Sequence, residues 1–278
     1  MRPRRTVGAA IGVACLLTVW ALAAGRQPEL TLPSPVETAA AFSDLWREGV
    51  LLGALGTTLG RAASGVLIAL GLGMVWGTLA GRSEWVAAIG RPAVATLMAV
   101  PPVVVVALGL VWLGPTGAVV RFVVVLVALP LLVVAVQEAV RDVDTDLVEM
   151  ATTFELSRWT VFRHVIAPGI ASPVLAAATV TAGQALRVGV MAELLGTSDG
   201  IGALVGRSRT NLDTAQLFAW AILLVVVVIA LEALVLGPLA RRLLRWRDPG
   251  PPGGRAPGPA RRPWWPSRPV GRFRPSGS

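Results

Sequence analysis

The chain has 278 residues, a formal net charge of +9, 54% hydrophobic and only 15% charged residues, and a mean hydropathy of +0.69. Soluble globular domains carry about 25% charged residues, so this composition excludes an ordinary water-soluble domain and indicates a chain surrounded mainly by lipid. With one cysteine, Cys15, and one histidine, His164, the sequence also excludes an intramolecular disulfide and a histidine metal cluster. It has no lysine, so a Walker A loop is excluded, and we expect neither a cofactor nor ATP hydrolysis by this chain.

Several stretches are long and apolar enough to cross a bilayer, which takes about 20 residues of helix. In chain order the expected spans are Val7–Ala24, Thr57–Ala80, Ala93–Leu113, Ala118–Val136, Ile170–Val190 and Leu217–Leu239. Arg61 lies near the start of the second span, where a long side chain can snorkel to the interface. Pro101-Pro102 should bend or break the third. The sequence therefore predicts an all-α membrane protein, a polytopic bundle of about six transmembrane helices within residues 7–240.

The arginines are distributed unevenly between the expected loops. They concentrate before the first span, between the second and third, between the fourth and fifth, and after the sixth. By the positive-inside rule both termini, including residues 1–6, and the loop around Glu149 are predicted to be cytoplasmic. The basic start, the apolar run and Ala21-Leu22-Ala23 also fit a cleavable signal peptide. Cleavage would leave five spans and would not move the Glu149 loop.

The loop of residues 141–168, between the fourth and fifth spans, is polar and amphipathic. Asp144 or Thr145 can cap a first helix, on which Leu147, Met150, Ala151 and Phe154 share one apolar face. A second short helix is predicted from Ser157 to Ile166, with Trp159, Phe162 and His164 available for contact, and Pro168 suits the start of the fifth span. The loop is either a connector packed on the bundle or a docking element. Its large apolar side chains favour a groove on a partner protein.

Glu149-Met150-Ala151, the turn near Glu155 and Val165-Ile166-Ala167-Pro168 resemble the EAA coupling loop in the membrane subunits of bacterial ABC importers. Other stretches between Leu32 and Leu204 resemble the sulfonate, taurine and nitrate branch of these permeases. They are Leu32-Pro33-Ser34-Pro35, Thr57-Thr58-Leu59-Gly60-Arg61, Pro101-Pro102 with Trp112-Leu113-Gly114, and 186–195 with Gly200-Ile201-Gly202. The resemblance implies ATPase-coupling roles for Glu149, Met150, Ala151, Phe154, Glu155, Ser157, Trp159, Phe162 and Pro168.

Three positions depart from the pattern of that family. Met150 replaces the usual alanine, Glu155 the usual glycine, and Ala167 a common leucine. Glycine adopts a positive φ without steric cost, so Glu155 indicates a turn that is either less tight or strained.

The resemblance also implies partners and a mechanism. A separate P-loop ATPase would bind the loop, an extracytoplasmic substrate-binding protein would deliver a small anionic solute, and a second permease copy would complete the pathway in the bacterial cytoplasmic membrane. ATP-driven closure of the ATPase would displace the loop and tilt the fourth and fifth spans. Binding of nucleic acid is not expected.

Polar groups in or near the spans are candidates for the pathway, and they are Gln137, Gln184, Arg187 and Glu193. Arg187 could attract an anion, or it could snorkel to the outer interface. Gly73, Gly77 and Gly81 form a small-residue face that would let helices approach closely, although glycine is abundant throughout, with 30 in the chain.

The tail, residues 241–278, is rich in proline, glycine and arginine, and we expect it to be disordered and cytoplasmic. Two other functions remain open. A secondary transporter would show intramembrane ionisable pairs or inverted repeats, and the sequence shows neither clearly. A membrane scaffold would not explain the Glu149 loop.

Overall fold

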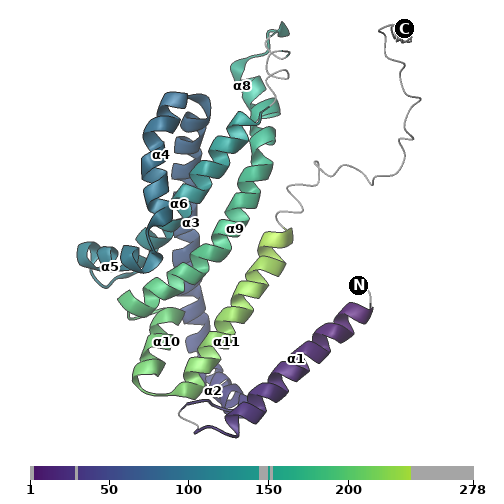
Figure 1. Ribbon diagram of the computed structural model, residues 1–278, viewed down its shortest axis with the longest axis vertical. Helices are drawn as coiled ribbons and strands as arrows, with labels where there is room; N and C mark the ends of the chain where they lie inside the picture. Colours follow the sequence, from purple (N-terminus) through teal and green to yellow (C-terminus); the bar gives the residue numbers. More distant parts are fainter. Residues whose placement is uncertain (1–2, 29–30, 144–149, 151–152, 239–278) are drawn as a thin grey trace, which may run out of the picture. The chain divides into compact units, whose positions relative to one another are not determined.

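The computed structural model describes residues 3–28, 31–143, 150 and 153–238, all within the first of two units, Met1–Leu243. Every regular element among these residues is helical (Figure 1). In order they are α1 (Pro3–Ala24), α2 (Pro35–Arg47), α3 (Val50–Arg82), α4 (Glu84–Ala99), α5 (Pro102–Leu113), α6 (Gly117–Arg141), α8 (Arg158–Val161), η1 (Phe162–Ile166), α9 (Ala167–Gly196), α10 (Ile201–Thr210), α11 (Thr214–Ala230) and η2 (Leu231–Leu236).

Among the described residues, four helices are long and apolar enough to cross a membrane: α3, α6, α9 and α11 continued by η2. They confirm four of the six expected spans, and each begins earlier than predicted, by one residue for α6 and by seven for α3. The first expected span is represented by the shorter apolar helix Ile11–Ala24. Within the described part of the chain, length and composition thus support four spans, or five if α4 and α5 form one bent span, and the remaining expected span, the first, corresponds to α1.

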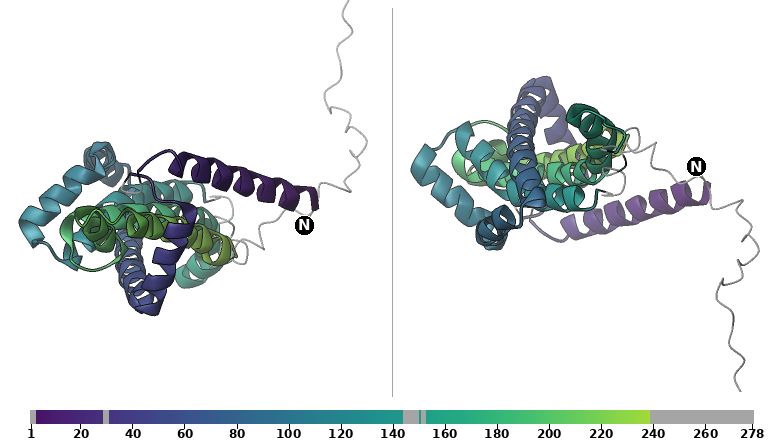
Figure 2. Two further views of the ribbon diagram at one scale, coloured as in Figure 1. Left: turned by 90° about the horizontal axis from the view of Figure 1, so that it is seen from below. Right: turned by 90° about the horizontal axis from the view of Figure 1, so that it is seen from above.

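The third expected span, Ala93–Leu113, is not a single helix. The chain bends by 98° between α4 and α5. Val100 and Pro101 both adopt extended backbone angles, because the ring of a proline crowds the residue before it, and Pro102 then begins α5. Figure 2 shows α4 and α5 as an elbow beside the bundle.

The centre of the bundle is α6, whose buried face packs against α3 and α9. Val120, Val123 and Val136 are fully buried there. On α3, a Cβ added to Gly73 would lie 2.9 Å from Leu132 Cβ, and one added to Gly77 would lie 2.6 Å from Val136 Cβ. The small-residue face predicted on α3 is therefore the surface on which α6 lies.

A shorter helix, α2, closes one end of the bundle. Ser34 caps it in a capping box with Glu37, as each side chain bonds the other residue's backbone N–H. Leu45 of α2 packs in a cluster with Leu51 of α3 and Trp220 of α11. This end also carries α10, whereas the opposite end carries α8, so the described part of the segment between α6 and α9 lies at the end opposite α2 and α10 (Figure 1).

Candidate functional site

The described part of the connecting segment presents large apolar side chains outward. The exposed fractions are 54% for Met150, 72% for Phe154 and 67% for Trp159. The ring of Trp159 stacks on that of Phe162, with centroids 5.7 Å apart. Glu149 and Ala151, together with the expected caps Asp144 and Thr145, lie outside the described residues. The outward aromatic face is the one predicted to meet a partner.

Backbone geometry fixes how this face is presented. The N–H of Phe154 donates to Met150 O at 3.2 Å, and the next residue, Glu155, has a φ of 55°. Ser157 then caps α8: its Oγ accepts from the N–H of Thr160 at 3.1 Å, and its carbonyl accepts from the N–H of Val161 at 3.0 Å. The tight turn is therefore kept without glycine, in a conformation that costs an L-residue about 1 kcal/mol or more.

The base of the segment is anchored in the bundle. Val161 is buried, and Ile166 packs with Val136 of α6 and Ile170 of α9. The predicted helix from Ser157 to Ile166 is confirmed as α8 followed by the π-helical η1, and Pro168 lies in the first turn of α9. The residues at the junction of η1 and α9, Ile166 and Ala167, both have α-helical backbone angles. The aromatic face is thus joined to α9 without a break.

The polar residues predicted for the pathway fall in three separate places. Gln137 borders a cavity between α3, α4 and α6. Gln184 and Arg187 lie one turn apart on α9, both exposed, and the guanidinium of Arg187 is 3.7 Å from the carboxylate of Glu232 on η2. Glu193 lies farther along α9 and is fully buried. The structure does not bring these residues together in one site.

Glu193 is the centre of a buried polar cluster near the N-terminal end of α3 and the C-terminal end of α9. One carboxylate oxygen accepts from Thr58 Oγ1 at 2.7 Å and from the N–H of Gly202 at 3.2 Å, and the other accepts from Arg61 Nη1 at 3.0 Å. Arg61 Nη2 also donates to Asp199 Oδ1 at 2.7 Å. Both oxygens of Glu193 are engaged within the chain, so its role in a pathway stays a prediction. Arg61 is held within the chain, because its guanidinium bonds two carboxylates.

Glycine lets the loop before α10 close over this cluster. Gly200 has a φ of 98°, and a Cβ there would lie 2.5 Å from the Glu193 carboxylate. The N–H of Ile201 donates to Thr58 Oγ1 at 2.9 Å. The cluster therefore ties α3, α9 and the loop together at the end of the bundle opposite the connecting segment.

Sequence reasoning missed two ion pairs. From the sequence, Arg61 and Arg187 are single arginines near helix ends. The expectation that the spans contain no clear ionisable pair is wrong, because each of these arginines lies beside a glutamate. Glu193 and Glu232 both lie in apolar helices, and asking which arginine could neutralise each of them would have found both pairs.

The fold and these sites together define a polytopic helical membrane protein with aromatic side chains exposed at one end. Residues 69–248 match the family described as binding-protein-dependent transport system inner membrane component, and the chain belongs to this family. It is a membrane permease subunit of ABC importer type. Its curated relatives are named as transport permeases, some of them as probable ABC transporter permeases, and membership of this class implies a separate ATPase and a substrate-binding protein as partners.

Three curated relatives are similar to this chain at nearly the same sequence identity. A putative aliphatic sulfonates transport permease, SsuC of Bacillus subtilis, is 30% identical and covers 84% of this chain and 86% of its own length. SsuC of Escherichia coli is 30% identical, with 83% and 88% covered. The riboflavin transport system permease RibX of Chloroflexus aurantiacus is 31% identical, with 86% and 90% covered.

Solved structures support the fold. An amino acid ABC transporter with histidines aligns with a TM-score of 0.55 and 16% identity, covering 75% of this chain and 96% of its own. The MetNI methionine ABC transporter, in an inward-facing conformation, aligns with a TM-score of 0.52 and 20% identity, covering 69% and 95%.

Proposed function

We propose that this chain forms one half of the pathway of an importer for a small anionic solute and transmits ATP-driven motion through the segment 141–168. The observation that carries the coupling role is the exposure of Met150, Phe154 and Trp159, in and just before the helical segment whose base is anchored in the bundle. Exposed aromatic residues at such a turn and short helix suit a hydrophobic groove on a partner protein.

A second copy of the chain is proposed to complete the pathway. The described helices leave many large apolar side chains exposed, including Leu67, Leu72 and Val75 of α3. Lipid covers part of this surface, and a symmetric partner would cover the remainder. With the aromatic face toward the cytoplasm, both termini lie on the cytoplasmic side and the cluster around Glu193 lies on the outer side, where a binding protein would dock.

The anionic character of the solute is proposed from the pair of Arg187 and Glu232. Both side chains are more than half exposed, at 57% and 52%. Arg187 lies within the candidate span Ala167–Gly196, and Glu232 lies near the end of the candidate span Thr214–Leu234. An exposed ion pair on such apolar helices faces a pathway or another protein surface more favourably than lipid. A solute anion can replace the carboxylate of Glu232 as the partner of the Arg187 guanidinium. Aliphatic sulfonates, transported by two of the named relatives, have the required charge.

The coupling role is tested by affinity capture of the tagged chain from its native membranes. We expect a P-loop ATPase to be recovered with the wild type and lost with Glu149→Arg, and its yield to fall at least fivefold with Trp159→Ala. Trp46→Ala is the matched control, because Trp46 is 61% exposed but lies on α2 at the other end of the bundle. Equal recovery of the ATPase with all four chains, at equal membrane content, would refute the assignment.

A further inference from the structure

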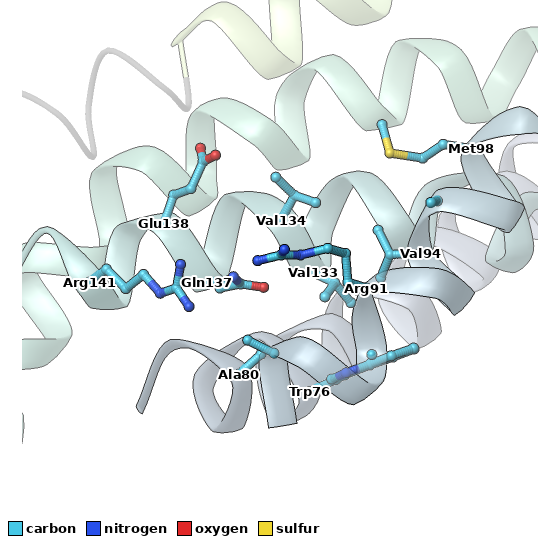
Figure 3. A pocket seen from close by; sticks show the side chains of 13 residues that line it. Trp76, Ala80, Arg91, Val94, Met98, Val133, Val134, Gln137, Glu138 and Arg141 are labelled. Carbon is cyan, nitrogen blue, oxygen red and sulfur yellow. The ribbon is translucent and has the colours of Figure 1, made fainter. Parts of the chain in front are cut away.

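A second site lies between α3, α4 and α6, at the end of the bundle that carries the connecting segment. It is a cavity of about 260 Å³, open to the surroundings of the bundle. Its polar rim is formed by Arg91, Gln137 and Arg141, and its apolar floor includes Trp76, Val94 and Met98 (Figure 3).

The rim carries excess positive charge. Figure 3 shows the guanidinium groups of Arg91 and Arg141 pointing toward each other across Gln137, while the carboxylate of Glu138 points away from them. Among the ion pairs of the described residues, neither arginine has a partner. Two converging guanidinium groups favour an anion between them, and phosphate oxygens match the fork of donors that arginine presents.

The shape of the cavity identifies the ligand further. Arg141 is the last residue of α6, at the end of the span, whereas Met98 lies two turns beyond Arg91 along α4, about 10 Å deeper at the rise of an α-helix. A free inorganic anion would occupy the rim and leave the apolar floor uncovered. A phospholipid matches both parts of the cavity, because its charged phosphate can lie at the basic rim while its acyl chain covers the apolar floor.

We propose that this cavity binds an anionic phospholipid, with its phosphate between Arg91 and Arg141 and an acyl chain over Val94 and Met98. Basic pockets between transmembrane helices near the cytoplasmic surface have the chemistry that anionic headgroups require. The lipid would join three helices at the point where α6 leads into the connecting segment, so that lipid composition would influence how firmly this segment is held. The binding itself does not depend on the transport function proposed above.

The test is native mass spectrometry of the purified full-length chain, delipidated and then returned to detergent micelles containing phosphatidylglycerol. We expect the wild type to retain phosphatidylglycerol, and the double variant Arg91→Gln/Arg141→Gln to retain at least fivefold less. Arg82→Gln is the matched control, because Arg82 is exposed at the same end of α3 but does not line the cavity. Its lipid retention should equal that of the wild type.

A second variant distinguishes lipid binding inside the cavity from nonspecific attraction of lipid by the two arginines. Val94→Trp keeps both arginines and fills the floor, so it should also lose the lipid while remaining monodisperse. Phosphatidylcholine and inorganic phosphate are the comparison ligands. The proposal is overturned if the double variant retains as much phosphatidylglycerol as Arg82→Gln, if Val94→Trp retains as much as the wild type, or if phosphatidylcholine or inorganic phosphate binds as well as phosphatidylglycerol.

Discussion

Glu155 shows how one residue can keep a backbone shape that its own chemistry opposes. The sequence left two possibilities, a looser turn or a strained one, and the φ of 55° shows that the turn is tight and strained. A left-handed conformation at a residue other than glycine persists only where its surroundings hold it in place, and such positions gather at functional segments. Here the capped start of α8 follows two residues later.

Replacing Glu155 with glycine should therefore stabilise the turn by about 1 kcal/mol, because the steric penalty of the left-handed region disappears. Glu155→Ala is the control, since alanine retains that penalty. Hydrogen–deuterium exchange of residues 153–161 should slow about fivefold in Glu155→Gly and stay near wild type in Glu155→Ala. Equal exchange in the two variants would show that the backbone strain has no energetic consequence.

Arg61 and Glu193 form the second feature at the scale of single residues. Glu193 is fully buried, and removing the guanidinium would leave its carboxylate without a charged partner. Loss of one member of such a pair costs about 3–5 kcal/mol. Arg61→Leu should thus lower the melting temperature in detergent strongly.

The double variant Arg61→Leu/Glu193→Gln tests whether charge is the reason. The neutral amide still reaches Thr58, so part of the stability lost in Arg61→Leu should return, with a coupling above about 1 kcal/mol. A double variant no more stable than Arg61→Leu would mean that packing, not charge, dominates at this position.

The contact between α3 and α6 decides stability at the scale of helices. Gly65, Gly73, Gly77 and Gly81 each face a side chain of α6 at a distance that leaves no space for a Cβ. Glycine abundance alone would scatter such residues around α3. Because they share one face, the backbones of α3 and α6 lie close together there. Such close packing holds helices together in lipid, where no hydrophobic driving force acts between them.

Gly77→Ala should accordingly destabilise the bundle by about 1–3 kcal/mol, the usual cost of overpacking. Gly71 lies on the same helix with no atom within 4 Å of a built Cβ, which makes Gly71→Ala the matched control. Thermal unfolding followed by circular dichroism in one detergent compares them. The packing argument fails if the two melting temperatures fall by the same amount.

The predictable and unpredictable parts of the fold have different physical origins. Apolar length predicted α3, α6, α9 and α11, because a bilayer fixes the length that a helix needs. Proline chemistry predicted the break before α5, although not its 98° angle, which depends on neighbouring helices. The partners of Arg61 and Arg187 could not be read from local spacing, because each pair joins residues far apart in the sequence and depends on the rotation of α9.

At the scale of the whole molecule, a variant of the ion pair of Arg187 and Glu232 tests the proposed transport role without disturbing the proposed contact with the ATPase. Arg187→Gln should reduce uptake of an aliphatic sulfonate at least tenfold, since the solute loses its counter-charge, while the chain still recovers its ATPase. Arg207→Gln is the control, as Arg207 lies on α10 outside the bundle spans. The measurement is uptake of labelled sulfonate by cells whose only sulfonate permease is this chain. Normal uptake by Arg187→Gln would remove Arg187 from the pathway.

The π-helical segment η1 sets the angular relation between the aromatic face and the rest of α9. A π turn holds one residue more than an α turn, and a single residue corresponds to about 100° around an α-helix. Deleting one residue within Phe162–Ile166 would restore α-helical winding and leave Trp159 on nearly the same side of the axis, because the wider π turn takes up its extra residue within one turn. The same deletion in the regular part of α9 would instead rotate Trp159 by about 100°, so the direction in which the aromatic side chains face tolerates the loss of a residue at η1 and at no neighbouring turn.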